Sequence, residues 1–185
     1  IQVLGNTFVA GGEELPLQIQ ITNRNSVDLE YTDLLIKYPD GAGESVRERV
    51  SLGTIKARET VVESRDIVLF GQQGSLEEVL VTVQYRTQGS NAIFGKDLSH
   101  FVTLNSAPID LAVEAGEQIV AGQRTSFIVK VRANNSVLNE DVGVKVEYPT
   151  GFRYEESSID PVFGDNIWSL GDLGAGVEKE ITISG

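Results

Sequence analysis

The feature that most constrains the fold of this chain is an internal repeat. Residues 21–41 read ITNRNSVDLEYTDLLIKYPDG and residues 131–151 read VRANNSVLNEDVGVKVEYPTG, which align without a gap at a spacing of 110 positions. Seven of the 21 pairs are identical, and most others keep their residue type, such as Leu34 with Val144. Self-similarity at a fixed spacing indicates that one structural unit has been duplicated. We therefore expect two copies of one β-rich module.

Alternation of apolar and polar residues predicts where the strands of this module lie. A period of two places one set of side chains in the core and the other in solvent, which is typical of a half-buried strand. The first copy has three such segments, and the second copy repeats the first two. The positions expected to face inward are Leu17, Ile19, Ile21, Thr32, Leu34, Ile36, Tyr38, Val79, Val81, Val83 and Tyr85 in the first copy, and Phe127, Val129, Val131, Val142, Val144, Val146 and Tyr148 in the second.

Less regular segments are expected to form turns and a linker. Residues 8–12 (FVAGG) are predicted to be a turn, which is repeated at 119–122. Residues 74–79 are the one candidate for a turn of helix, with Ser75 as its N-cap, and a segment without a helix is the equal alternative. Residues 105–108 (NSAP) are polar and contain proline, so they are predicted to link the two copies.

Short strands separated by Gly, Pro and Asn turns, with about 100 residues in the complete copy, are typical of an immunoglobulin-like antiparallel β-sandwich. The chain is therefore predicted to be all-β, with tandem sandwiches at residues 1–106 and 108–185. No further segment shows a helical period.

The second copy is predicted to be incomplete, because it has no counterparts of residues 78–86 and 93–104. These segments are expected to be the last two strands of the first sandwich. Without them the second sandwich would expose an apolar face and unpaired strand edges. Three interpretations remain open. The chain is a piece of a longer protein, the second copy is a smaller degenerate sandwich, or a neighbouring subunit donates the missing strand.

Composition excludes several classes of function. With 27 acidic and 15 basic residues the net charge is −12, which argues against nucleic acid or an anionic membrane as a partner. The chain contains no cysteine, which rules out disulfides, thiolate metal sites and cysteine nucleophiles. No apolar run is long enough to span a bilayer, so no membrane insertion is expected in this segment. Because methionine is absent, we expect Ile1 to begin a processed chain or a fragment.

The sequence offers no convincing catalytic, cofactor or metal site. His100 is the only histidine, and one histidine without a nucleophile motif is a poor basis for a triad or a metal centre, so it is expected to be an ordinary surface or edge-strand side chain. Loop carboxylates could bind Ca²⁺, but no D-x-D-G run is present, and a solvated acidic surface is the favoured interpretation. The carboxylates considered are Glu13, Glu14, Asp28, Glu30, Asp33, Asp40, Glu44, Glu155, Glu156, Asp160, Asp165 and Asp172.

Three further features have simple structural interpretations. Lys37 and Lys145 are predicted to point outward, which argues against a Lys–Asn isopeptide cross-link. The sequence at 134–136 (NNS) is a glycosylation sequon in a predicted loop, a pattern that is common by chance. Trp168 is expected to anchor the core of the second sandwich, with carbohydrate stacking as the alternative.

The order of motifs in the second copy resembles a known family. Residues 134–136 (NNS), a strand ending in 148–151 (YPTG), and 168–176 (WSLGDLGAG) follow one another as in the DUF11 repeats of prokaryotic surface proteins, and CARDB-like adhesion modules are similar. The first copy has YPDG at 38–41 but no Trp, and Tyr replaces the usual Leu before Pro in both copies. The resemblance implies extracellular repeats arrayed as stalks, adhesins or surface layers.

The predicted function is therefore architectural. The chain is expected to be a structural module of an extracellular surface protein, acting as a stalk, filament or surface-layer spacer by domain stacking and not as an enzyme. Its expected partners are neighbouring repeats or other subunits of a surface assembly, with strand donation to the second domain as one form of contact. The alternative is an adhesin-type module that contacts a glycan or a protein through its loops.

Overall fold

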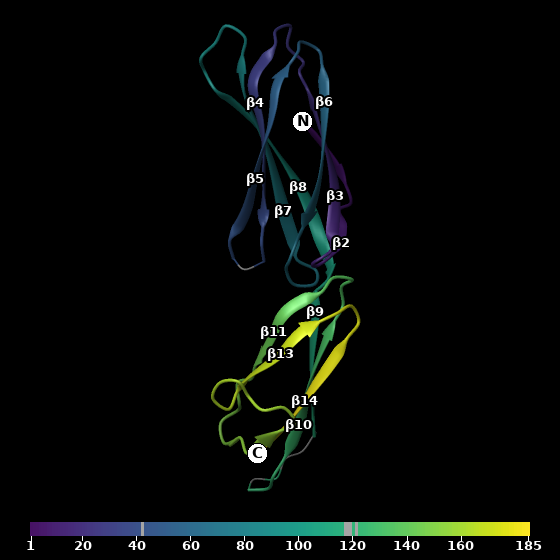
Figure 1. Cartoon of the computed structure of the whole chain (residues 1–185), viewed down its shortest axis with the longest axis vertical. Coiled ribbons are helices and arrows are strands. Elements are labelled where there is room, and N and C mark those ends of the chain that lie inside the picture. Colours follow the sequence, from purple (N-terminus) through teal and green to yellow (C-terminus); the bar gives the residue numbers. More distant parts are fainter. Residues whose placement is uncertain (42, 117–119, 121) are drawn as a thin grey trace. The chain divides into compact units, whose positions relative to one another are not determined.

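The computed structural model describes residues 1–41, 43–116, 120 and 122–185. This part of the chain consists of β-strands and turns, so the predicted all-β class is confirmed. It contains no helix long and apolar enough to cross a membrane. Two compact units are present, Ile1–Ala107 and Pro108–Gly185 (Figure 1). The second begins with the proline that we predicted to end the linker.

The first unit is a sandwich of two sheets. One sheet has the strand order β1–β3–β6 and the other β2–β8–β7–β4–β5. Neighbouring strands are antiparallel except for β2 and β8, which are parallel. This order, in which β3 pairs with β6 while β4 pairs with β7, is the Greek-key pattern of the immunoglobulin fold. The strands are β1 (Gln2–Gly5), β2 (Phe8–Ala10), β3 (Glu14–Thr22), β4 (Leu29–Pro39), β5 (Ser45–Ile55), β6 (Thr60–Val68), β7 (Leu76–Thr87) and β8 (Phe94–Ser106).

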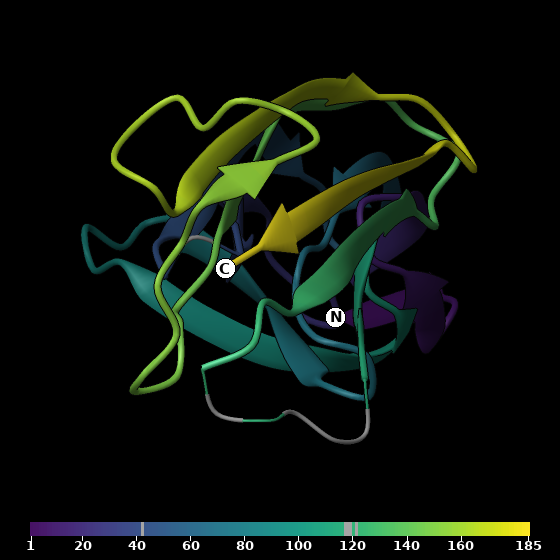
Figure 2. The same ribbon diagram turned by 90° about the horizontal axis from the view of Figure 1, so that it is seen from below.

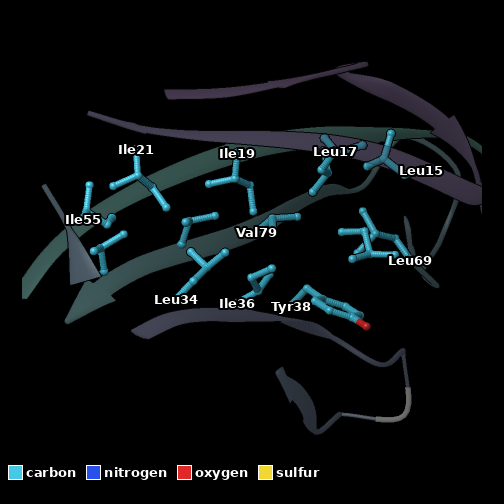
Figure 3. Packing of buried hydrophobic residues seen from close by; sticks show 14 of the residues in the cluster. Leu15, Leu17, Ile19, Ile21, Leu34, Ile36, Tyr38, Ile55, Leu69 and Val79 are labelled. Carbon is cyan, nitrogen blue, oxygen red and sulfur yellow. The ribbon is translucent and has the colours of Figure 1, made fainter. Parts of the chain in front are cut away.

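Alternation in the sequence explains how this sandwich is packed. Side chains from β3, including Leu17 and Ile19, point toward side chains of the opposite sheet, including Leu34, Ile36 and Val79 (Figure 3). Every inward position predicted in this unit is buried except Tyr85, which is half-buried. The hydrophobic effect at these alternate positions therefore holds the two sheets together.

The second unit contains the counterparts of only some of these strands. Its larger sheet has the order β12–β14–β10–β9, and β11 and β13 form the smaller one. In Figure 2, β14, drawn in yellow, lies beside β10, with which it pairs in antiparallel orientation. The strands are β9 (Ile109–Ala115), β10 (Ser126–Ala133), β11 (Asn139–Lys145), β12 (Glu156–Ser157), β13 (Ile167–Leu173) and β14 (Glu178–Ser184).

The spacing of 110 positions is preserved in the strand pairing of the two units. Val3 of β1 is paired with Ile19 of β3, and Val113 of β9 is paired with Val129 of β10. The two units also share a backbone irregularity. Tyr31 and Asp141 have φ angles of 50° and 51°, and the register shifts at both positions. Such β-bulges bend and twist a strand, and no residue type in the sequence predicted them.

One open alternative is decided and one local prediction was wrong. Residues 74–79 form no turn of helix, because the chain turns at Gly74 and Ser75 and then enters β7 at Leu76. The inward packing of Val79 on a period of two outweighs the N-cap signal at Ser75. Phe8–Ala10 is the strand β2, and the turn is confined to the two glycines that follow it. The repeated turn at 119–122 includes Ile119 and Ala121, which lie outside the described residues.

Candidate functional site: the open face of the second unit

Strand β11 has a free edge at the position where the first unit has another strand. In the first unit β4 lies between β5 and β7. Among the described residues of the second unit, β11 pairs only with β13. Val144 corresponds to Leu34 at the common spacing, and it pairs with β13 as Leu34 pairs with β5, so the free edge of β11 is the edge that β7 covers in the first unit. An unpaired edge presents N–H and C=O groups that can pair with another strand.

An apolar groove of about 410 Å³ borders this edge. Its walls come from β9, β10 and the segment from Val144 to Pro149. Leu111 and Val113 lie on β9 within it, and their side chains are 63% and 61% exposed. Their counterparts at the common spacing, Ile1 and Val3, are packed against the core of the first unit. The groove is therefore an apolar face that one unit covers and the other leaves open.

Aromatic rings lie at one end of the groove. The ring centroids of Phe127 and Phe152 are 5.6 Å apart, and those of Tyr148 and Phe152 are 4.9 Å apart. The hydroxyl of Tyr148 donates a hydrogen bond to the backbone oxygen of Asp165 at 2.6 Å. Stacked and edge-on ring pairs contribute about 0.5–1.5 kcal/mol beyond the area that they bury. These contacts therefore stabilise this end of the groove.

The outer surface of the β11 segment carries opposite charges. Lys145 Nζ lies 3.3 Å from Glu147 Oε1, and both side chains are largely exposed. The alternate residues Val144, Val146 and Tyr148 face inward, as the sequence predicted. The segment thus continues to alternate beyond Lys145, although regular pairing with β13 ends there. A polar outer face beside an apolar groove is the surface of a sheet that another strand could extend.

Tyr148 and its counterpart Tyr38 are expected to resist ionisation. The pKa of Tyr148 is raised to about 12, mainly by burial and to a smaller extent by the nearby Asp165. The pKa of Tyr38 is also raised to about 12, mainly by burial and to a smaller extent by its hydrogen bond to Glu48. Each neutral phenol stabilises the fold below pH 10, and this contribution is lost between pH 10 and about 12. Tyrosinate absorbance should therefore show a late phase near pH 12. If Tyr38→Phe and Tyr148→Phe leave that phase unchanged, the assignment is wrong.

The residues considered for catalysis or metal binding are dispersed. His100 Nε2 lies 3.2 Å from the backbone oxygen of Asn6 at the sheet surface. Asp28 Oδ1 accepts a hydrogen bond from the amide of Ala57 at 2.8 Å, and Arg124 forms ion pairs with the carboxylates at the start of β12. In the described ranges, no group of three or more His, Cys, Asp or Glu side chains could hold a metal ion.

The other sequence features occupy ordinary structural positions. Lys37 and Lys145 are exposed, as predicted, and Asn134 of the sequon lies on the surface. Trp168 is fully buried in the core of the second unit, as predicted, and its indole N–H donates to the backbone oxygen of Ile159 at 2.9 Å. The tryptophan is therefore a core anchor and is not available for stacking against a sugar.

Sequence reasoning missed the floor of the groove. Residues 109–115 read IDLAVEA, in which Ile109, Leu111 and Val113 alternate with polar or small residues. This alternation, placed 110 positions after Ile1 and Val3, could have identified β9 and its inward face. The groove could not be inferred from β9 alone, because it requires β9, β10 and β11 to come together.

Comparisons with known proteins give little information about this chain. No protein-family model matches it, and no curated protein matches it. Among solved structures, red sea bream transglutaminase is similar at 13% identity and a TM-score of 0.41, over 99% of this chain and 26% of the transglutaminase. The sporulation control protein Spo0M from Bacillus subtilis is similar at 13% identity and a TM-score of 0.38, over 77% of this chain and 76% of Spo0M. Likenesses this distant carry no argument about function.

Proposed function

We propose that this chain is a structural module of an extracellular surface assembly, in which β-sandwich units act as load-bearing spacers and no residue performs catalysis. The motifs that resemble surface-protein repeats support this setting, because they occupy structural positions. Trp168 is a core anchor, and Tyr38 and Tyr148 lie at the ends of equivalent strand segments. The side chains of these motifs are packed within the fold, which suits a mechanical role.

The observation that carries the proposal is the parallel pairing of β2 with β8. Phe8 is paired with Thr103 and Ala10 with Ser106, and the amide of Gly11 donates to the oxygen of Ser106 at 2.9 Å. Strand β2 lies near the start of the first unit and β8 at its end. Tension applied across the unit therefore pulls two parallel strands in opposite directions along their axes. Their hydrogen bonds then bear the load together instead of opening one after another.

Force spectroscopy on the full chain, held at its two ends, tests this proposal. We expect Val9→Pro to lower the unfolding force of the first unit, because proline has no N–H to contribute to the β2–β8 ladder. Val9→Ala is the matched control, since it trims the side chain but keeps the amide, and it should retain more of the force. The expected equilibrium cost of the lost hydrogen bond is only about 1 kcal/mol. Equal unfolding forces for the two variants would refute the load-bearing role.

A second candidate is an adhesin-type binding module. A cleft of about 530 Å³ at one end of the first unit is lined by Arg24, Asn25, Tyr85 and Lys96, among others. Tyr85 is stacked with Phe94 at a centroid distance of 5.7 Å. An aromatic ring beside amide and cationic groups is suited to a sugar or an acidic peptide. Saturable binding of such a ligand to this cleft would favour the second candidate over the spacer.

A further inference from the structure

We propose that Arg65, held in place by Glu63, closes the free edge of β6 against pairing with a strand of another molecule. The inference concerns what keeps neighbouring units from joining side by side. It goes beyond the load-bearing role, because that role depends on β2 and β8 and the closed edge depends on β6.

Strand β6 is a long edge strand. Among the described residues it pairs only with β3, and it extends over nine residues, Thr60–Val68. An exposed edge of this length is a template for pairing with another chain. The other sheet also has a long edge, β5, whereas the edge strands β1 and β2 have only four and three residues. Very short edge strands are poor templates, so β5 and β6 are the two edges of the first unit that need protection.

The inward face of β6 carries an ion pair where apolar side chains would be expected. Ile19 is paired with Glu63 and Leu17 with Arg65, so both charged side chains lie on the face of the sheet that is directed to the core. Arg65 Nη2 lies 2.6 Å from Glu63 Oε1, and the two side chains are 34% and 24% exposed. A strand added to β6 would remove much of this remaining contact with water. Taking an ion pair out of water carries a large desolvation cost.

The register with β3 shows which backbone groups point to the free edge. The amide of Asn23 donates to the oxygen of Glu59 at 2.9 Å, so Glu59 directs its C=O toward the β3 side. Successive residues of an antiparallel strand direct their backbone groups to opposite sides, and the register of β3 with β6 is continuous from Glu14 to Thr22. The even-numbered residues from Thr60 to Asp66 therefore direct their N–H and C=O groups to the free edge.

Arg65 covers one of these free groups. Its Nη1 donates a hydrogen bond to the backbone oxygen of Ser64 at 3.3 Å. Ser64 lies in the middle of the free edge, and its oxygen is an acceptor that an added strand would need. The guanidinium group, which also contacts Glu63, therefore occupies the place of an incoming N–H. An arriving strand must displace it from Ser64 while taking water away from the ion pair.

The second unit shows the opposite arrangement where the edge is covered. The corresponding places of β14, opposite β10, hold Ile181 and Ile183, which are fully buried. There β12 pairs with the other side of β14, and the amide of Ser158 donates to the oxygen of Thr182 at 2.9 Å. Apolar residues thus occupy these places where the chain covers the edge itself, and an ion pair occupies them where the edge is free.

Strand β5, the other long edge, also carries an inward charged residue. Glu48 is paired with the buried Ile36, and its Oε1 accepts a hydrogen bond from the hydroxyl of Tyr38 at 2.7 Å. The short edges β1 and β2 contain no charged residue. Inward-pointing charges and very short strands are two ways in which proteins blunt the edges of sheets. Each edge of the first unit uses one of them.

The double variant Glu63→Val, Arg65→Val tests the proposal in the full chain. Replacing a partly buried ion pair by apolar residues is often neutral or stabilising, so the first unit should stay folded. We expect the amides of Val62 and Ser64 to become about tenfold or more protected from hydrogen exchange as the protein concentration rises, because they then pair with another molecule. In the wild-type chain, exchange of these two amides should not depend on concentration.

The double variant Thr60→Val, Ser64→Val is the matched control. It adds two valines to the outward face of the same strand, leaves the net charge unchanged and keeps Arg65 and Glu63. The amide of Val62 should therefore exchange as in the wild-type chain at every concentration.

Protection of the Ile19 amide, which lies opposite Glu63, shows whether the first double variant keeps β3 paired with β6. If it does not, Arg65→Met decides, since it removes the guanidinium group but keeps an unbranched side chain. The proposal is overturned if neither variant gains concentration-dependent protection at Val62 and Ser64. It is also overturned if the control gains as much, or if the wild-type chain already shows this protection. These results concern β6 alone, so the load-bearing role is judged separately by the unfolding force.

Discussion

Trp168→Ala is expected to unfold the second unit while the first unit remains folded. The indole is fully buried and lies in contact with the ring of Tyr154, at a centroid distance of 6.4 Å. Truncating a buried tryptophan to alanine costs about 3–5 kcal/mol, because the cavity left behind closes only in part. Small domains have a free energy of unfolding of about 5–15 kcal/mol. A unit that already leaves one apolar face open has little stability to lose.

Hydrogen exchange measured by mass spectrometry separates the two units. In Trp168→Ala, amides of β10 and β14 should exchange rapidly, while those of β3 and β4 should stay protected. Trp168→Phe is the matched control. It keeps an aromatic ring but loses the hydrogen bond to Ile159, so a smaller loss of about 1–3 kcal/mol is expected. Loss of protection in both units together would contradict the division at Pro108.

Much of the first unit could be predicted because its signals are local. Alternation in 17–21 and 32–38 identified β3 and β4 with the correct buried face, since a period of two needs only the neighbouring residues. The helical turn that was one of two alternatives at 74–79 is absent for the same reason. The N-cap signal of Ser75 is local, whereas the pairing of β7 with β4 and β8 depends on residues far away in the sequence.

The internal repeat allowed strands of the second unit to be predicted from those of the first, but it did not do so for every strand. At Ile181 and Ile183 the spacing of 110 positions no longer applies. In the structure they pair with Val129 and Phe127. The equivalent residues of the first unit, Ile19 and Leu17, pair with Glu63 and Arg65. The segment between β11 and β13 is longer than the segment between β4 and β5, so the spacing of 110 positions does not hold after β11.

The candidate site was predicted in outline only. Comparing the two copies indicated that the second one lacks two strands, and hence that some apolar surface is exposed. It did not indicate which side chains form the groove, because Leu111, Phe127 and Val144 come from three strands. It also gave no account of the direction of the backbone groups at Lys145, which follows from the register with β13.

Equivalent positions of the two units are expected to differ sharply in their cost of truncation. Ile36 is fully buried in the core on a strand that β7 flanks, whereas its counterpart Val146 is half-buried beside the groove. Ile36→Ala should cost about 2–5 kcal/mol, because it leaves a cavity in a closed core. Val146→Ala should cost less than about 1.5 kcal/mol, because the side chain is only partly removed from water.

The difference in size between the two native residues must be separated from the effect of the groove. Ile36→Val provides that control, since the step from Ile36→Val to Ile36→Ala removes the same two methyl groups as Val146→Ala. Urea unfolding followed by the fluorescence of Trp168 reports the second unit, and hydrogen exchange reports the first. If the two valine-to-alanine steps cost the same, Val146 is as well enclosed as Ile36. The groove would then be filled by the unit's own side chains.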